Sequence, residues 1–212
     1  MIITPNCEKE LLTISKCKLP QNYKMLLQSY EIYVTPYNKK LLFSKLTHNK
    51  SLNAAYLGKY ISPNAYWALE LLTSNDPELF LSFKFTLGHE ISHTLKKTNA
   101  FLYKMKKWNN VQQYNVNFFA WLNEIYADFN GIVLMCNSNR KDGLKAFKYK
   151  ANRINNEIID QNHPTNEQRY YFIQNFDFDE RLIRYVAKLQ CYPTEHDIKI
   201  AINYFPEIIL NN

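Results

Sequence analysis

The chain has 212 residues, a formal net charge of +7 and a pI of about 9.1. Its hydrophobic content of 46% and aromatic content of 15% exclude a disordered chain and are typical of a folded globular protein. No apolar run approaches the roughly 18 residues of a membrane-spanning helix, and the first residues lack the layout of a signal peptide. We therefore expect a single domain over residues 1–212 that does not span a membrane and that acts in the cytoplasm or is a soluble piece of something larger.

The positive charge raises the question of nucleic acid as a partner, because clustered cations bind phosphate backbones. The lysines are spread along the chain, however, and the densest group is only Lys104, Lys106 and Lys107. Nucleic acid is therefore not the partner that we expect, and the oligomeric state is left open.

The first part of the chain indicates strands. Residues 30–35 alternate between apolar and polar side chains, as a short strand does. Residues 53–62 are rich in β-forming side chains around Gly58, which predicts one or two strands with a tight bend.

The rest of the chain indicates helices. Asp76 and Pro77 fit the N-cap and first position of a helix that we predict to run to about residue 97. Gly88 inside that helix would let another segment approach closely. Apolar side chains at three- and four-residue steps predict a second long helix over residues 117–135.

Four further helices are predicted. They lie within residues 142–160, after a capping box of Thr165 and Gln168, over residues 177–190, and from Thr194 to about 205. The sequence therefore predicts an α+β fold that is mostly helical and has a small sheet.

The motif HExxH, formed by His89, Glu90, Ile91, Ser92 and His93, lies in the first long helix. Residues four apart share a helical face, so both histidines can bind one metal ion. Two neutral imidazoles and a carboxylate form the open site of hydrolytic zinc enzymes, and Glu90 can then reach a metal-activated water. Apolar neighbours indicate that this helix is buried, where polar side chains without partners are costly. The motif therefore predicts one Zn²⁺ per chain.

A third ligand is expected from the second long helix. Glu124 and Asp128 are four residues apart in a helix whose apolar pattern places it in the core. Glu124 can bind the zinc ion, while Asp128 can accept the outer N–H of a ligand histidine and fix its ring. The alternative is an ordinary solvated acidic pair.

Four blocks in this order give the chain a resemblance to the gluzincins, and more narrowly to the HtpX and CAAX-prenyl-protease family of zinc metallopeptidases. The blocks are residues 53–61, 76–93, 124–128 and 163–169, within a family-like core of about 53–175. The chain lacks the membrane-spanning helices of those proteins and so resembles the soluble members. Its first ~50 and last ~35 residues have no counterpart in the resemblance.

The resemblance implies a zincin-like metallopeptidase domain with an HExxH active-site helix. It implies Glu90 as the general base and His163, with Asn53 second, as donors to the oxyanion of the transition state. The alternative for His163 is a loop histidine before a helix-starting proline.

The resemblance also assigns supporting roles. Arg169 would pair with Asp128 or orient His163, a surface salt bridge being the alternative. Tyr60 and Ile61 would offer backbone groups to an extended substrate.

The function that follows is a zinc-dependent endopeptidase acting on proteins or peptides. A dedicated regulatory protease that cuts a single partner is one alternative. The other is a non-catalytic basic binding protein with a structural metal. The substrate and any gating segment are not predicted.

Overall fold

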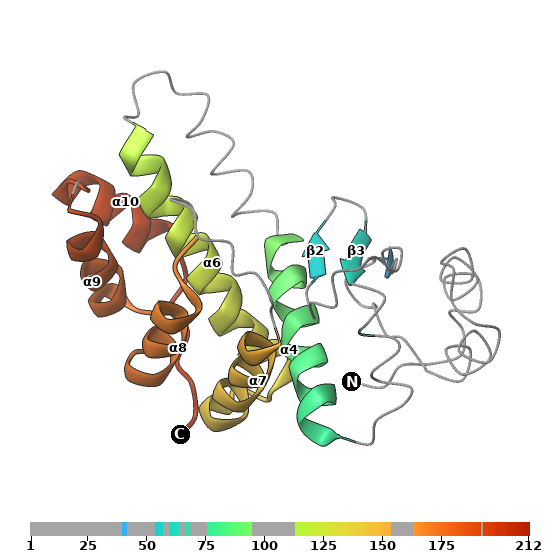
Figure 1. The fold of residues 1–212 in the computed structure, drawn as a ribbon. Helices are drawn as coiled ribbons and strands as arrows, with labels where there is room; N and C mark the ends of the chain where they lie inside the picture. Colours follow the sequence, from blue (N-terminus) through green and yellow to red (C-terminus); the bar gives the residue numbers. More distant parts are fainter. Residues whose placement is uncertain are drawn as a thin grey trace.

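The structure is a computed structural model that describes residues 40–41, 54–56, 60–63, 67, 76–94, 113–153, 163–191 and 193–212. These residues contain six helices and three short strands (Figure 1). Among them, no helix is both long enough and apolar enough to cross a bilayer.

Two long helices at the centre carry the HExxH motif and the acidic pair. They are α4 (Pro77–Thr94) and α6 (Gln113–Met135), and they pack directly against each other. The crossing brings Gly88 of α4 against Gly131 of α6, where a Cβ on Gly88 would come within 2.9 Å of Gly131 backbone atoms. The close approach expected at Gly88 is confirmed, and it places the motif next to α6.

The ends of the helices follow local sequence signals. Asp76 accepts a hydrogen bond of 2.8 Å from the backbone N–H of Glu78, as its predicted N-cap role requires. Thr165 and Gln168 form the predicted capping box at the start of α8 (Asn166–Asn175). Thr194 and Asp197 form another at the start of α10 (Glu195–Tyr204).

Two other helices differ in extent from their predictions. The helix expected within residues 142–160 is α7 (Arg140–Asn152). The helix expected from residue 177 is α9 (Glu180–Gln190), with Asp179 as its N-cap. It begins later because Phe178 forms an antiparallel bridge with Ile208 near the C-terminus, a pairing that no local signal reveals.

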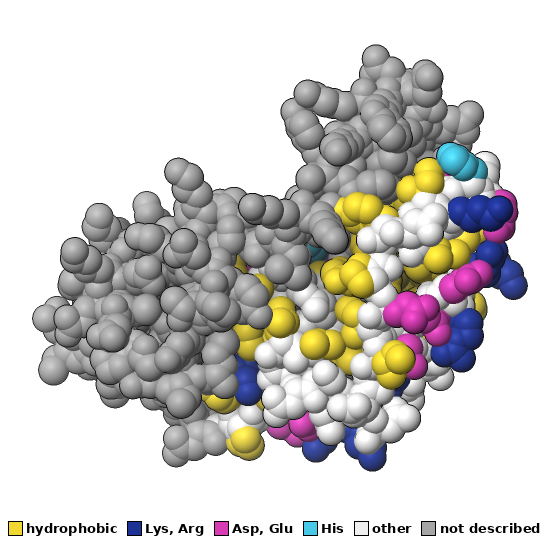
Figure 2. Space-filling view, turned by 180° about the vertical axis from the view of Figure 1, so that it is seen from behind, with side chains coloured by type: hydrophobic (Ala, Val, Ile, Leu, Met, Phe, Trp, Pro, Cys, Tyr) yellow, Lys and Arg dark blue, Asp and Glu magenta, His cyan; other side chains and the backbone are white. Residues whose placement is uncertain are grey.

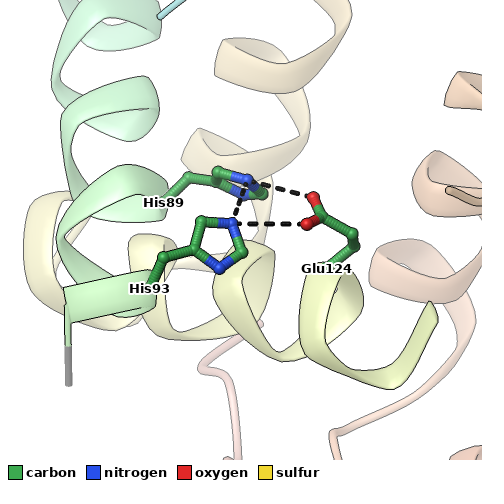
Figure 3. A group of neighbouring side chains, drawn as sticks. All are labelled: His89, His93 and Glu124. Carbon is green, nitrogen blue, oxygen red and sulfur yellow. Dashed lines mark hydrogen bonds and ion pairs between the residues drawn. The ribbon is translucent and has the colours of Figure 1, made fainter. Parts of the chain in front are cut away.

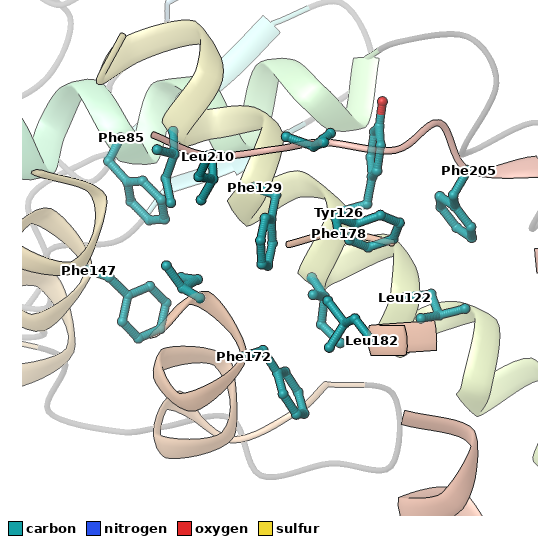
Figure 4. Packing of buried hydrophobic residues seen from close by; sticks show 14 of the residues in the cluster. Phe85, Leu122, Tyr126, Phe129, Phe147, Phe172, Phe178, Leu182, Phe205 and Leu210 are labelled. Carbon is teal, nitrogen blue, oxygen red and sulfur yellow. The ribbon is translucent and has the colours of Figure 1, made fainter. Parts of the chain in front are cut away.

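The core contains aromatic and aliphatic side chains, most of them from the helices (Figure 4). Phe178 lies at its centre, with ring centroids 5.2 Å from Tyr126, 5.8 Å from Phe129 and 5.6 Å from Phe205. The last ~35 residues, which the resemblance left unplaced, therefore belong to the same core as α6. Arg140 of α7 contacts both ends of this segment, because its guanidinium donates to the carbonyl of Phe176 and to Asp177 and also to Oδ1 of Asn212.

The strands β1 (Lys40–Leu41), β2 (Ala54–Tyr56) and β3 (Tyr60–Pro63) are paired in the order β1-β3-β2. The β2–β3 pair is antiparallel on either side of Gly58, and the β1–β3 pair is parallel. They lie beside α4, on the side away from α9 and α10 (Figure 1). The strand expected over residues 30–35 lies outside the described residues.

The α+β class predicted from the sequence is wrong for the described part of the chain. Its six helices have 10 to 23 residues, whereas the paired strands have only two, three and four. Strands in globular proteins usually have five or six residues. These short ladders form no layer with a face of its own, and the helices pack on one another instead. The zincin-like fold with a small sheet, which the resemblance implied, is corrected with it to a helical assembly.

The described part of the face drawn in Figure 2 is not dominated by one sign of charge. Figure 2 shows Lys and Arg side chains interleaved with Asp and Glu along one side of that face. Arg184, for example, bonds to both Glu180 and Glu195.

Candidate metal centre

Three potential metal ligands meet where α4 crosses α6. His89 and His93 project from α4, and Glu124 projects toward them from α6 (Figure 3). Their ligand atoms all lie within 4.8 Å of one another. The structure thus brings together the three side chains that the sequence predicted as ligands.

The spacing of these atoms suits a small tetrahedral ion. Nε2 of His89 lies 3.1 Å from Nε2 of His93. The Glu124 carboxylate oxygens lie 3.3 Å from the first nitrogen and 3.4 Å from the second. Ligands bound to tetrahedral zinc at about 2.0–2.1 Å are about 3.3 Å apart. The donor set and its spacing therefore fit zinc, although the same atoms would also accept other divalent ions.

His89 is held from behind by a carboxylate. Its Nδ1 lies 2.8 Å from Oδ1 of Asp128, one helical turn after Glu124. Arg169 donates two hydrogen bonds to Asp128, of 2.7 and 2.6 Å, and its guanidinium lies over the ring of Phe147. The Asp128 bond directs Nε2 of His89 toward the proposed metal position. Two roles were predicted for Arg169, and the structure shows the contact that the first requires, the pairing with Asp128.

The charges around the ligands shift their pKa values strongly. Burial lowers the pKa of His89, but the carboxylates of Asp128 and then Glu124 outweigh burial and raise this pKa to about 9. Burial and the neighbouring His89 lower the pKa of His93 to about 4. Burial raises the pKa of Glu124, but the two histidines outweigh it and hold the pKa well below its usual range. Without a metal ion at neutral pH, a protonated His89 would therefore pair with the carboxylates of both Asp128 and Glu124.

His93 has an outer partner that the sequence analysis did not identify. Nδ2 of Asn123 lies 3.2 Å from Nδ1 of His93. Oδ1 of Asn123 is buried and has no hydrogen bond. A histidine that binds a metal through Nε2 needs an acceptor for its Nδ1 proton. Exchanging the positions of Nδ2 and Oδ1 of the Asn123 amide would place Oδ1 next to Nδ1 of His93. The available signal was the position of Asn123 directly before Glu124.

Two further charged side chains, Glu90 and Lys150, are buried in the described part of the chain. Glu90 is buried beside His89, with only 6% of its surface exposed, and its charge acts on both Arg169 and Lys150. Lys150, at the end of α7, was not identified from the sequence because lysines are usually exposed.

The other site residues predicted from the sequence are His163, Asn53, Tyr60 and Ile61, and the structure bears on them to different extents. Nε2 of His163 lies 3.9 Å from a Glu124 oxygen, so this half-exposed side chain borders the centre. Asn53 lies outside the described residues. The pairing of Tyr60 and Ile61 with an extended substrate stays a prediction. In the three-stranded order Ile61 is paired with both β1 and β2, whereas Tyr60 is paired with β1 alone. A substrate strand needs a free edge, which β3 does not offer at Ile61.

Comparisons of the chain with protein-family models, with curated proteins and with solved structures gave no match. A function is therefore inferred from the geometry of the site and from the motifs of the sequence.

Proposed function

We propose that this chain is a zinc-dependent endopeptidase, as its resemblance to soluble members of the HtpX and CAAX-prenyl-protease family implies. One observation carries the proposal. His89, His93 and Glu124, from two helices, converge at the spacing of tetrahedral zinc ligands, and Asp128 fixes the outer nitrogen of His89. We also propose, from the sequence alone, that the protein acts in the cytoplasm.

The proposed roles follow from the chemistry of the side chains. A bound zinc ion would supply a Lewis acid that polarises the peptide carbonyl and activates water near neutral pH. Glu90 then takes the proton from the attacking water and transfers it to the leaving amine. His163, at the border of the centre, donates a hydrogen bond to the oxyanion that develops on the carbonyl oxygen. Asp128 and Arg169 keep His89 oriented throughout.

The test is proteolysis by the zinc-loaded protein, with unfolded casein and a mixed peptide pool as substrates and mass spectrometry as the readout. Glu90→Gln should lower the rate by about 10²-fold or more while the bound zinc is retained, because it removes the general base. Glu78→Gln, which alters an exposed glutamate of the same helix, should have no effect.

Undiminished cleavage by the Glu90→Gln protein would refute the proposal. A cut at one bond of one cellular protein, with casein left intact, would point instead to the dedicated regulatory protease.

A further inference from the structure

Two buried hydroxyl groups of α4 are not used by the proposed mechanism. Ser82 and Thr86 are 0% and 1% exposed. Among the residues that the structure describes, neither Oγ of Ser82 nor Oγ1 of Thr86 has a hydrogen-bond partner. Buried polar groups are normally hydrogen-bonded, because burying them without a partner costs free energy. A partner is therefore expected for both hydroxyls.

A third buried hydroxyl of the same helix shows the usual arrangement. Oγ of Ser92 donates a hydrogen bond of 2.7 Å to the carbonyl oxygen of Gly88 and accepts one from Asn130 of α6. Serine and threonine within helices often bond in this way to the carbonyl four residues earlier. Ser82 and Thr86 do not make this bond in the structure, so their hydroxyls remain available to another group.

The spacing of the two hydroxyls leads along α4 to Glu90, the proposed general base. Ser82, Thr86 and Glu90 are four residues apart from one another in turn, so they follow one face of the helix. Side chains at this spacing have Cβ atoms about 5–6 Å apart, and they lean back over the preceding turn. Glu90 is buried as well, with 6% of its surface exposed. The carboxylate therefore adjoins the turn that carries Thr86.

These three groups have complementary hydrogen-bonding capacities. A carboxylate accepts several hydrogen bonds, whereas a hydroxyl donates one and accepts others. Hydroxyls on successive turns are within reach of one bridging water, and a buried water typically binds about three polar partners. Ser82, Thr86 and Glu90 supply three such partners on one buried face.

We propose that Thr86 is a positioning residue for Glu90. Its hydroxyl holds the Glu90 carboxylate through a bound water molecule that Ser82 also binds. This contact fixes the carboxylate in the orientation from which it takes the proton of the attacking water. The inference rests on the proposed function, because it gives Thr86 a role only where Glu90 is the general base.

The test measures kcat and KM for the cleavage of dye-labelled casein by the zinc-loaded protein. Thr86→Val keeps the shape of the side chain and removes the hydroxyl. It should lower kcat about tenfold or more and leave KM and zinc content unchanged, because a misplaced catalytic group slows the reaction. Thr86→Ser, which keeps the hydroxyl, should restore most of the rate. Ser82→Ala should cause a smaller loss of kcat, and it repeats the test if Thr86→Val does not fold.

Two further readouts separate a positioning role from a structural one. In the Glu90→Gln background, Thr86→Val should cause no additional loss of rate, because the two side chains act as one unit. In urea unfolding of the metal-free protein, Thr86→Val should not raise stability, whereas removing an idle hydroxyl from a dry core would raise it.

The failure of this inference differs from the failure of the proposed function. An unchanged kcat in Thr86→Val, an equal loss of rate in the Glu90→Gln background, or a stabilised Thr86→Val protein would overturn the inference alone. No cleavage of casein by the wild type, or undiminished cleavage by the Glu90→Gln protein, would overturn the proposed function and this inference with it.

Discussion

The crossing of α4 and α6 leads to a specific prediction for Gly131→Ala. A Cβ at this position would lie 2.9 Å from the backbone nitrogen of His89 and 3.3 Å from the carbonyl oxygen of Phe85. Both neighbours are backbone atoms of α4 and cannot rotate away. The two helices must therefore separate by about 0.5 Å to restore an ordinary contact distance.

Two consequences follow from this separation. Overpacking costs about 1–3 kcal/mol, and the better helix propensity of alanine offsets about 1 kcal/mol of it, so a net destabilisation of up to about 2 kcal/mol is expected. Glu124 would also move away from His89 and His93. Because zinc ligand distances tolerate only about 0.2 Å, zinc affinity should fall about tenfold or more.

The assays are urea unfolding and zinc competition against a chelating dye. Gly143→Ala is the matched control, because its Cβ would meet the side chain of Ile132 in the α6–α7 contact and not the backbone beside the ligands. It should change stability without changing zinc affinity. Unchanged stability and unchanged zinc affinity in the Gly131 variant would refute the argument that this crossing sets the ligand spacing.

Three further predictions concern the partners of the ligands. Arg169→Met should destabilise the metal-free protein by about 3–5 kcal/mol in urea unfolding, because it leaves the buried Asp128 carboxylate unpaired; Arg181→Met, at an exposed arginine, should cause no measurable change. Burial lowers the pKa of His89, but Asp128 outweighs it, so the folded value of about 9 lies above the ordinary 6.5. This raised pKa contributes stability that is complete below about pH 6.5 and is lost as the pH rises through 9. The unfolding free energy of the metal-free protein should therefore fall by about 3 kcal/mol across that window relative to His89→Gln, and a parallel pH dependence of the two proteins would contradict this. Asn123→Ala should weaken zinc binding about 10- to 100-fold in dye competition, since it removes the outer partner of a ligand histidine; an unaltered dissociation constant would exclude that role.

The parts of the fold that local sequence determines could be predicted. Asp76 caps α4 and Thr165 caps α8 through bonds to residues two or three positions away, so the signal lies within a few letters. The ligands could be predicted for the same reason. A spacing of four residues places His89 with His93, and Glu124 with Asp128, on one helical face whatever the rest of the chain does.

The features that could not be predicted depend on contacts between distant residues. The later start of α9 follows from the pairing of Phe178 with Ile208, thirty residues away. The central place of β3 follows from its parallel partner β1. The burial of Lys150 depends on how α7 packs against α4, and a lysine in sequence gives no sign of it.

The prediction of an α+β fold class was wrong for a related reason. Strand-forming side chains around Gly58 indicate pairing but not how far it extends, and the described strands stop after two to four residues. The resemblance rests on short motifs, and these predicted the ligands. The sheet that the resemblance also implied does not form a layer in the described part of the chain.

The most direct test of the metal centre is the zinc content of the purified protein, measured by elemental analysis in the wild type, in Glu124→Ala and in Glu78→Ala. The account predicts about one zinc ion per chain in the wild type and in the exposed Glu78 variant, and little or none in the Glu124 variant, which loses one of three ligands. A wild-type protein that takes up no zinc even when zinc is supplied, or a Glu124 variant that keeps its full content, would contradict it.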